Sequence, residues 1–508
     1  PTRQLMYGYD PQTLTSDIID WQAYRDGVGT SALSGNTITL SGLSPTLQES
    51  RHRYASFYAN ASYSYLSRYN VSGSIRWDQA DLFGLDIRNQ RHPLWSVGAS
   101  WIMSEESFMK DIVWLDFLKA RMTYGINGNV DQSSTTYFVV KQKTQSNPIK
   151  TTYLTYDDDD LPNPKLRWEK TATYNVGLDF RLFNNLVNGS LYYNRHSSDL
   201  LVRRYMDPTL GAKSRVVNNG EMRNRGIEFS LTANLIRKKD WNFAVDFNFA
   251  HNKNKMLKVD HSDSDTSTSF IMSPQNYFME GTSYNTLWAY RIDRIENGYP
   301  VAVDKDGNDL VTFNEDGTVA NITTGLSLKG TENLVNLGSL TPKFNGAVSL
   351  RLSYKGIALN AFFVYAGGNK LRNSVVSMSD QVGSQTLKDI TNRWSADAPD
   401  ANVRMYIDMP TKVKTYASTF QDWWQYGDIN VKDAGYVKLR SLSLGYSLPS
   451  GICRQIRLNS LNLKLQVNNL FTWCKAGSDI DPESYGLNSG TRGMASPKTY
   501  SIGLSTSF

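Results

Sequence analysis

The sequence predicts an all-β protein, a transmembrane antiparallel β-barrel with long extracellular loops. Apolar and polar residues alternate strictly over segments of about ten residues, the length of a strand that crosses a membrane. Short turns alternate along the chain with long polar loops, as they do in outer-membrane barrels. A transmembrane helix is excluded, because no run of roughly 18 apolar residues is present and the mean hydropathy is −0.44.

The composition agrees with a membrane interface and excludes several classes. The chain has 508 residues with Tyr 29, Phe 20 and Trp 12, and tyrosine combines an apolar ring with a polar tip that suits interfaces. Lys+Arg 54 against Asp+Glu 48 gives a net charge of +6, which is too small for this length to indicate nucleic-acid binding. Residues 1–9 show no secretory signal, so the chain is either cytosolic or a processed or partial one.

Six segments show the alternation most clearly. In 173–182, Tyr174, Val176 and Leu178 alternate with polar or small neighbours such as Asn175 and Gly177. Soluble sandwiches also alternate, so the period of two leaves both folds open. The other five segments are 227–235, 241–249, 344–354, 461–468 and 499–508.

The lengths of the connections favour the barrel. Short turns are expected on the periplasmic side and long loops outside the cell. The predicted short turns are 66–68, 184–186, 238–240 and 355–356, and the long polar segments are about 128–168, 196–222, 252–284, 371–433 and 474–496.

Parity limits the number of strands. The strand before the turn at Leu66 and the final strand both run toward the periplasm, so the count between them is odd. Alternation and turns place about fourteen strands, which predicts one more crossing between Thr286 and Phe313 and about 15 strands in all. Residues 1–50 lack the pattern and are predicted to be an extracellular loop segment, with barrel over 51–508.

Several phrases carry a family resemblance. The sequence resembles the C-terminal half of the SusC/RagA family of TonB-dependent outer-membrane transporters. The phrases include RYASFYANASYSYLSRYNVSGSIRWD at 53–78, LPNPKLRWEKTATYNVGLDFRLFNN at 161–185, NNGEMRNRGIEFSL at 218–231, DAGYVKLRSLSLGYSLP at 433–449 and LQVNNLFTW at 465–473.

This resemblance implies a 22-stranded barrel around an N-terminal plug, with the plug absent from this chain. It implies two partners, a SusD-like surface lipoprotein and the TonB–ExbB–ExbD complex, which would act through the missing N-terminal part. A second polypeptide segment would then carry the plug and about seven strands, and it would pair with the strands at 53–65 and 498–508.

The implied function is active import of oligosaccharides or peptides across the outer membrane of a Gram-negative bacterium, by a multi-pass protein. The substrate is not altered, so neither catalytic residues nor a cofactor is expected. The alternatives are a TonB-dependent siderophore or cobalamin receptor, and an outer-membrane adhesin or barrel enzyme. A hydrolase-like trio at His196, Ser197 and Asp199 is sequential, whereas triads are recognised by geometry.

A cluster of aromatic residues in the long polar segment 371–433 is the predicted site of contact with substrate or lid. Aromatic rings stack on sugars or receive peptide side chains. The alternative is that these rings pack the loops against each other or against a partner. The residues are Trp394, Tyr406, Tyr416, Trp423, Trp424 and Tyr426.

A second aromatic set lies at strand ends and predicts the girdles that anchor a barrel at the membrane interface. The C-terminal Phe508 is the expected assembly signal, as the resemblance implies. The girdle residues are Tyr63, Tyr65, Tyr69, Trp77, Trp95, Trp101 and Trp473.

Two further features have structural interpretations. Asp304, Asp306 and Asn308 match the first ligand positions of a calcium loop, but the required glycine is displaced, and a hairpin turn is the preferred interpretation. Cys453 and Cys474 bracket one strand, so they are too far apart for a disulfide.

Overall fold

The structure is a computed structural model of the whole chain. It describes most of the predicted barrel and much of the longer loops. The described residues are 53–80, 93–129, 168–205, 214–259, 265–323, 328–376 and 409–507. Shorter described ranges are 2–4, 9–10, 15–16, 29–30, 37–38, 48–50, 141–144 and 152–155, and positions 378, 391, 394, 395 and 403 are described singly.

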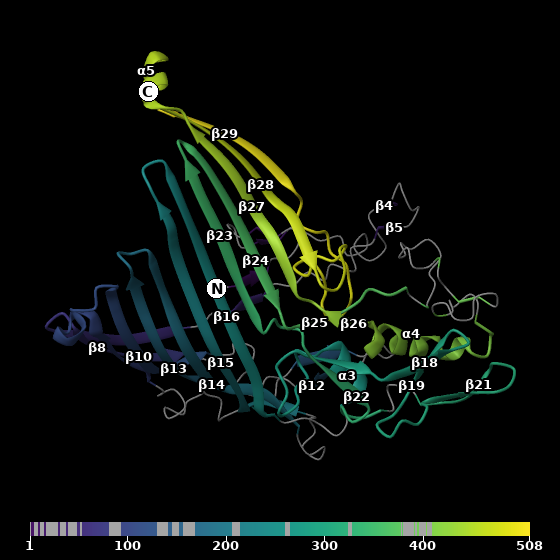
Figure 1. Cartoon of the computed structure of the whole chain (residues 1–508). Coiled ribbons are helices and arrows are strands. Elements are labelled where there is room, and N and C mark those ends of the chain that lie inside the picture. The colour runs from purple at the N-terminus through teal and green to yellow at the C-terminus, as the bar shows by residue number, and fades with distance from the viewer. Residues whose placement is uncertain are drawn as a thin grey trace.

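A single 13-stranded antiparallel sheet dominates the described residues, and its strands follow one another in chain order. Figure 1 shows this curved sheet with α3 (Ser267–Met272), α4 (Ala417–Gln425) and several short strands near one end of it, and α5 (Ser450–Gln455) at the other end. The strands are β7 (Tyr54–Tyr65), β8 (Tyr69–Ala80), β9 (Leu94–Ile102), β10 (Leu115–Asn129), β13 (Glu169–Leu182), β14 (Val187–Tyr205), β15 (Ser214–Arg237), β16 (Trp241–Lys258), β23 (Phe344–Tyr354), β24 (Ile357–Gly367), β27 (Tyr436–Ser447), β28 (Ser460–Cys474) and β29 (Thr499–Ser507).

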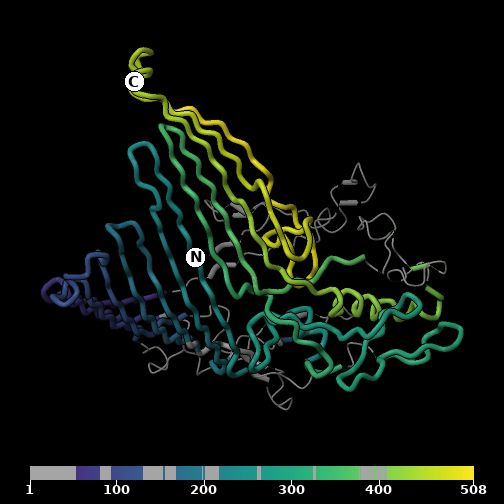
Figure 2. The backbone as a smooth tube through the Cα atoms, viewed as in Figure 1, coloured from purple at the N-terminus to yellow at the C-terminus, as the bar shows by residue number. Residues whose placement is uncertain are grey.

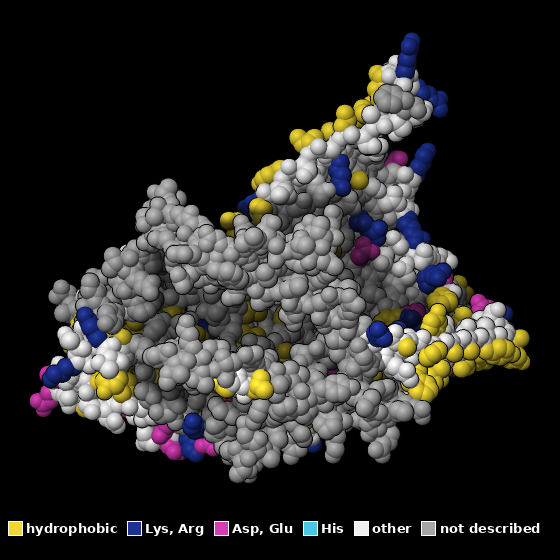
Figure 3. All heavy atoms as spheres, turned by 180° about the vertical axis from the view of Figure 1, so that it is seen from behind, with side chains coloured by type: hydrophobic (Ala, Val, Ile, Leu, Met, Phe, Trp, Pro, Cys, Tyr) yellow, Lys and Arg dark blue, Asp and Glu magenta, His cyan; other side chains and the backbone are white. Residues whose placement is uncertain are grey.

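The register joins the apolar faces of all these strands into one surface. Leu178 lies opposite Leu191, Leu191 opposite Phe229, and Phe229 opposite Phe249. Because side chains alternate between the two faces of a sheet, this pairing places the polar residues together on the other face. The predicted alternation and fold class are therefore confirmed, and Figure 3 shows hydrophobic side chains in bands along the sheet margins.

The short turns lie where the sequence predicts them. Lys355 and Gly356 form a two-residue connection between Tyr354 and Ile357, with φ of 42° and 88°. Both values suit the type I′ turn that matches the twist of a hairpin. The connection between β27 and β28 is longer and contains the helix α5 (Ser450–Gln455). Figure 2 traces the long connections to the opposite end of the sheet.

The predicted crossing between Thr286 and Phe313 is wrong. Strand β16 pairs directly with β23, so the described sheet has 13 strands instead of about 15, and the count remains odd. The segment forms short strands that pair outside the sheet, because its residues are buried in the loop region instead of alternating toward lipid. They are β17 (Thr286–Tyr290), β18 (Ile292–Glu296), β19 (Tyr299–Ala302) and β20 (Val311–Phe313), which pair with β22 (Leu334–Ser339), each other and β21 (Val319–Ile322).

The predicted long loop at 196–222 is also corrected. Strands β14 and β15 have 19 and 24 residues, and they stay paired as far as Tyr205 opposite Ser214. At about 3.3 Å per residue, β15 is roughly 80 Å long. This hairpin therefore extends well past the membrane, because its two strands satisfy each other's backbone groups without lipid or a third strand.

Aromatic rings border the apolar face at both ends. Near the short turns, Tyr69 stacks on Trp101 with ring centroids 6.3 Å apart, and near the long loops Trp95 meets Tyr124 at 5.5 Å. All seven predicted girdle residues lie on this face by register: Tyr63, Tyr65, Tyr69, Trp77, Trp95, Trp101 and Trp473. The position suits an interface anchor, and the anchoring role stays a prediction.

Cys453 and Cys474 are free, as expected, and Phe508 lies outside the described residues. In the part of the chain that the structure describes, no helix has the length and apolarity to cross a membrane. The remaining elements of the described residues are β1 (Thr2–Gln4), β2 (Tyr9–Asp10), β3 (Thr15–Ser16), β4 (Gly29–Thr30), β5 (Thr37–Ile38), β6 (Gln48–Ser50), β11 (Lys141–Thr144), β12 (Thr152–Thr155), β25 (Lys370–Arg372), β26 (Val431–Asp433), α3 (Ser267–Met272), α4 (Ala417–Gln425) and four short 3₁₀ turns at Met103–Glu105, Ser107–Met109, Lys414–Tyr416 and Asp428–Asn430.

Arginine substitutions at adjacent positions of β28 test which face meets lipid. Leu465 is on the apolar face and Gln466 on the polar face. Leu465→Arg should destabilise the assembled barrel by about 2–4 kcal/mol, because it buries a charge in the hydrocarbon region, while Gln466→Arg should be tolerated. Urea titration of the folded, heat-modifiable band measures both. Equal losses would contradict the assignment of faces.

Candidate functional site

Ion pairs and hydrogen bonds join neighbouring strands across the polar face of the sheet. Arg121 Nη2 lies 2.7 Å from Asp179 Oδ1, and Tyr192 Oη donates to the same oxygen at 2.8 Å. Arg351 Nη2 lies 2.8 Å from Asp246 Oδ1 in the same way. With lipid on the apolar face, this paired polar wall faces the interior of the barrel.

A hollow of about 440 Å³ lies on this polar wall. Its lining combines Arg121, Glu228 and His196 with the amides of Asn175 and Asn194, so both signs of charge and both donors and acceptors are present. The wall can therefore hold polar solutes or polar protein segments.

The hydrolase-like trio is not assembled by the described contacts. His196 Nδ1 lies 3.0 Å from Thr173 Oγ1 on the neighbouring strand. The side chains of Ser197 and Asp199 lie outside the described residues.

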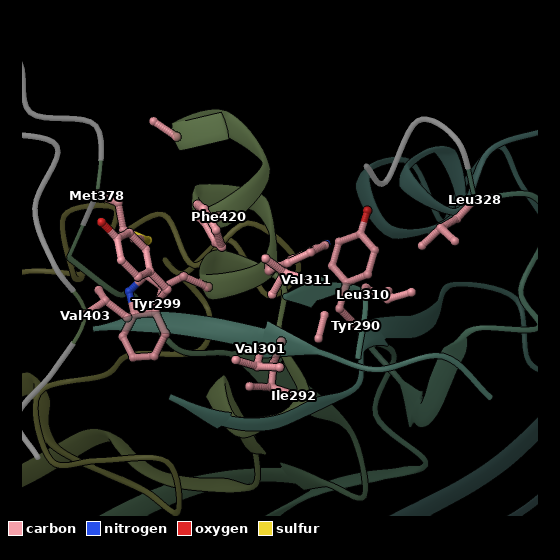
Figure 4. Packing of buried hydrophobic residues seen from close by; sticks show 14 of the residues in the cluster. Tyr290, Ile292, Tyr299, Val301, Leu310, Val311, Leu328, Met378, Val403 and Phe420 are labelled. Atoms are coloured by element: carbon pink, nitrogen blue, oxygen red, sulfur yellow. The ribbon is translucent and has the colours of Figure 1, made fainter. Parts of the chain in front are cut away.

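At the other end of the sheet, two long connections pack into a shared hydrophobic core, called the loop core below. The connections run from β16 to β23 and from β24 to β27, and Figure 4 shows part of the packing. The buried members are Phe270, Ile271, Trp288, Tyr290, Ile292, Tyr299, Val301, Ala302, Leu310, Val311, Leu328, Leu334, Met378, Val403, Met409, Val413, Ala417, Phe420, Trp423 and Trp424.

Helix α4 supplies the aromatic side of this core. Ala417, Phe420, Trp423 and Trp424 are its buried residues, and spacings of three, four and seven put them on one helical face. Phe420 packs against Tyr299 with ring centroids 4.8 Å apart and meets Trp423 edge to face at 5.7 Å. The helix is thus held by its aromatic face.

The proposed contact of Trp423 and Trp424 with substrate must be revised. Trp423 is fully buried, and Trp424 is 6% exposed and donates from Nε1 to the Val376 carbonyl at 3.1 Å. Both rings therefore pack the loops, which was the alternative interpretation. The segment is polar overall, but Phe420, Trp423 and Trp424 share one face of α4, and that face is buried.

The other predicted aromatics are less enclosed. Tyr416 and Tyr426 are half-buried and pack against the loop core. Trp394 is half-buried, and its backbone N–H donates to the Val403 carbonyl at 3.2 Å. Tyr406 lies outside the described residues. Contact of these rings with a substrate or partner stays a prediction.

Arg372, which the sequence did not predict as a site residue, holds three extracellular loops together. They are the loops that join β16 to β23, β24 to β27 and β28 to β29. Its side chain is fully buried and donates to the carbonyls of Asn488 and Trp288, each at 2.8 Å. Its guanidinium lies 4.9 Å from the centroid of the Tyr426 ring. Burial lowers the pKa of Arg372 to about 10. The short phrase KLR after β24 carries no sequence signal for such a role.

A buried lysine anchors the last extracellular connection. Lys438 is 1% exposed on the polar face of β27, and its Nζ lies 2.8 Å from Asp481 Oδ2 and 2.6 Å from Glu483 Oε2. Both carboxylates belong to the segment between β28 and β29, which therefore folds against the inner wall. The pairing was also missed, because the partners are more than 40 positions apart in the chain.

The acidic segment at Asp304 forms a turn, which is the interpretation that the sequence favoured over a calcium loop. Asp304 Oδ1 accepts from the backbone N–H groups of Asp306 and Asn308 at 2.9 and 2.8 Å, and Asn308 Nδ2 donates to Oδ2. The hydrogen bond from the Asn308 side chain lowers the pKa of Asp304. Among the described residues, no group of three His, Cys, Asp or Glu side chains could hold a metal ion.

Comparisons with known proteins agree with this architecture. The family described as "TonB dependent receptor-like, beta-barrel" matches residues 2–470. TonB-dependent receptor P3 of Formosa agariphila is 26% identical over 474 residues, which are 89% of this chain and 44% of that protein. TonB-dependent receptor SusC of Bacteroides thetaiotaomicron is 30% identical over 283 residues, 52% of this chain and 28% of SusC.

The fold is similar to that of solved RagAB structures. The structure of the RagAB peptide importer in its "closed-closed" state matches with a TM-score of 0.70 and 24% identity, covering 94% of this chain and 49% of that one. The chain spans about half the length, or less, of the curated relatives named above.

Truncation of Trp423 tests whether the loop core folds as a unit. Trp423→Ala should destabilise this core by about 3–5 kcal/mol, because it leaves a large cavity. Pulse proteolysis should then cut within 265–430 at lower urea, while the barrel band keeps its heat-modifiability. Ile429→Ala is the matched control, since Ile429 is 49% exposed. Equal resistance of both variants would argue against a cooperative core.

Proposed function

Because the chain belongs to the TonB-dependent receptor-like β-barrel family, we propose that it forms the C-terminal part of an active importer of oligosaccharides or peptides. The protein is an outer-membrane β-barrel, and its family consists of transport receptors and not of enzymes. The resemblance to the SusC/RagA family implies import of glycans or peptides, and the fold similarity to the RagAB peptide importer is consistent with peptides.

The observation that carries the proposal is the separation of the two sheet faces over 13 strands. A continuous apolar face suits lipid, while the opposite face carries paired charges such as Arg121 with Asp179. A wall of this kind passes polar solutes without exposing unpaired charge to them. Polar oligomers, such as sugars and peptides, fit it better than apolar cargo does.

The proposal includes the strands that would close the barrel. Strands β7 and β29 are the two edges of the sheet and do not pair with each other. In lipid, the unpaired N–H and C=O groups of an edge cost several kcal/mol each. With a 22-stranded barrel, nine further strands would complete it between these edges, together with the plug, and residues 1–50 would form an extracellular loop segment.

Two partners follow from the proposal. A SusD-like lipoprotein would cover the extracellular end, where the loop core offers a rigid, internally packed platform. The TonB–ExbB–ExbD complex would supply energy through the N-terminal part. Tyr416, Tyr426 and Trp394, which are only half-buried, are the aromatic residues proposed to contact the substrate or the lipoprotein.

Copurification and uptake in the native bacterium test this function. The affinity-tagged full-length receptor should bring down a surface lipoprotein, and uptake of its labelled glycan or peptide should stop when either the receptor or TonB is deleted. The cargo recovered from the cells should be chemically unaltered. Uptake of a ferric siderophore without any lipoprotein, or conversion of the cargo without TonB, would contradict the proposal.

A further inference from the structure

Three cations stand side by side on neighbouring strands. Arg195 of β14 lies opposite Arg225 of β15, and Arg225 lies opposite Lys253 of β16. All three side chains are exposed, and the described residues provide no ion pair for any of them. Directly opposed side chains are only about 5 Å apart, so like charges in this arrangement repel each other.

The row continues one step farther from the membrane. Two residues along each strand, Arg223 of β15 lies opposite Lys255 of β16. The two rows therefore place five cations on three strands, a set called the outer basic patch below. The first carboxylate on β15 beyond these rows is Glu221, opposite Lys258, so the patch itself contains no acidic residue.

The register fixes the face on which the patch lies. Tyr193 is opposite Ile227, and these apolar residues come two positions before Arg195 and after Arg225 along their strands. Since residues two apart share a face, the patch is on the lipid-facing side, directly beyond the apolar band. It lies toward the long loops, where the headgroups of the outer leaflet would be.

The inner face of the same strands is different. There Glu228 accepts a hydrogen bond from Asn194 Nδ2 at 2.8 Å, and Asp246 pairs with Arg351 at 2.8 Å. These two inner-wall carboxylates thus have partners, whereas the described residues offer no ion pair to the cations of the outer patch. The excess of positive charge therefore lies on the lipid-facing side of the sheet, which a transported solute does not contact.

A hollow beside β16 includes Lys253 and Lys255 of the patch in its lining. It has a volume of about 540 Å³, and its lining combines cations with hydroxyl and amide groups and includes no aspartate or glutamate. Such a lining suits a phosphate group on a polar headgroup such as a sugar. The lining residues include His251, Lys253, Lys255, Lys343, Asn252, Asn254, Thr282, Ser283, Thr286, Asn336, Ser339 and Thr341.

We propose that the outer basic patch binds the phosphate groups of anionic glycolipid in the outer leaflet. Four of its five cations are exposed and Arg223 is half-buried, and the described residues offer none of them an ion pair. The patch lies next to the apolar band and outside the barrel lumen, and basic residues at this level attract anionic headgroups. Bound phosphate would also relieve the repulsion between Arg195, Arg225 and Lys253. A soluble anionic cargo is disfavoured because the patch faces away from the inner wall.

Lipid binding to the full-length receptor in neutral detergent tests the proposal. The probes are bisphosphorylated lipid A and the same lipid without phosphates, measured by native mass spectrometry. Arg195→Gln/Arg225→Gln/Lys253→Gln should weaken binding of the phosphorylated lipid by about tenfold or more, since each surface cation contributes to the attraction. The unsubstituted receptor should bind the dephosphorylated lipid as weakly as the triple variant binds the phosphorylated lipid.

Matched variants separate the patch from net charge. Lys110→Gln/Lys238→Gln/Lys239→Gln removes three exposed cations at the short-turn end and should leave binding unchanged, and Arg225→Lys alone should largely retain it. Heat-modifiability checks that each variant is assembled. Equal binding by both triple variants, or equal binding of both lipids, would overturn the proposal. Dextran sulfate binding as tightly as lipid A would assign the patch to soluble polyanions and would also overturn it.

Discussion

The rest of this structure depends on one constraint, the need to pair every backbone N–H and C=O group in a region without water. A sheet satisfies that need only between neighbours, so the 13 strands follow one another as a continuous antiparallel ladder. Among the residues that the structure describes, no strand pairs with the outward edges of β7 and β29. Closure of the barrel by further strands is therefore a physical requirement of the proposed importer, in addition to a family likeness.

Pairing the backbone also fixes which side chains share a face. A slip of one residue would exchange lipid-facing and inward-facing side chains over a whole strand, and the unbroken line from Leu178 through Phe229 to Phe249 excludes such a slip there. Outside the membrane the constraint relaxes. Water satisfies exposed backbone groups there, so the connections build an ordinary hydrophobic core and use buried Arg372 to hold it to neighbouring loops.

Sequence could predict what the lipid dictates and little beyond it. The alternation at 173–182 predicted β13, and the pair Lys355–Gly356 predicted a turn, because both follow from local geometry. The false crossing at Thr286–Phe313 arose from the strand count, because about fourteen strands were placed where the described sheet has 13, and parity then required one more. For Trp423, sequence left substrate contact and loop packing both open, and Arg372 was missed as a connector, because their partners come from distant segments that only the fold brings together.

Site-directed labelling of β28 tests the two-faced sheet most directly. In the full-length receptor with Cys453 and Cys474 replaced by serine, single cysteines at positions 463 to 468 would carry a nitroxide spin label, and its collisions with oxygen in lipid and with a nickel chelate in water would be measured. Positions 463, 465 and 467 should contact lipid, and 464, 466 and 468 should contact water or the barrel interior. Accessibility without a period of two, or with the opposite phase, would contradict the account.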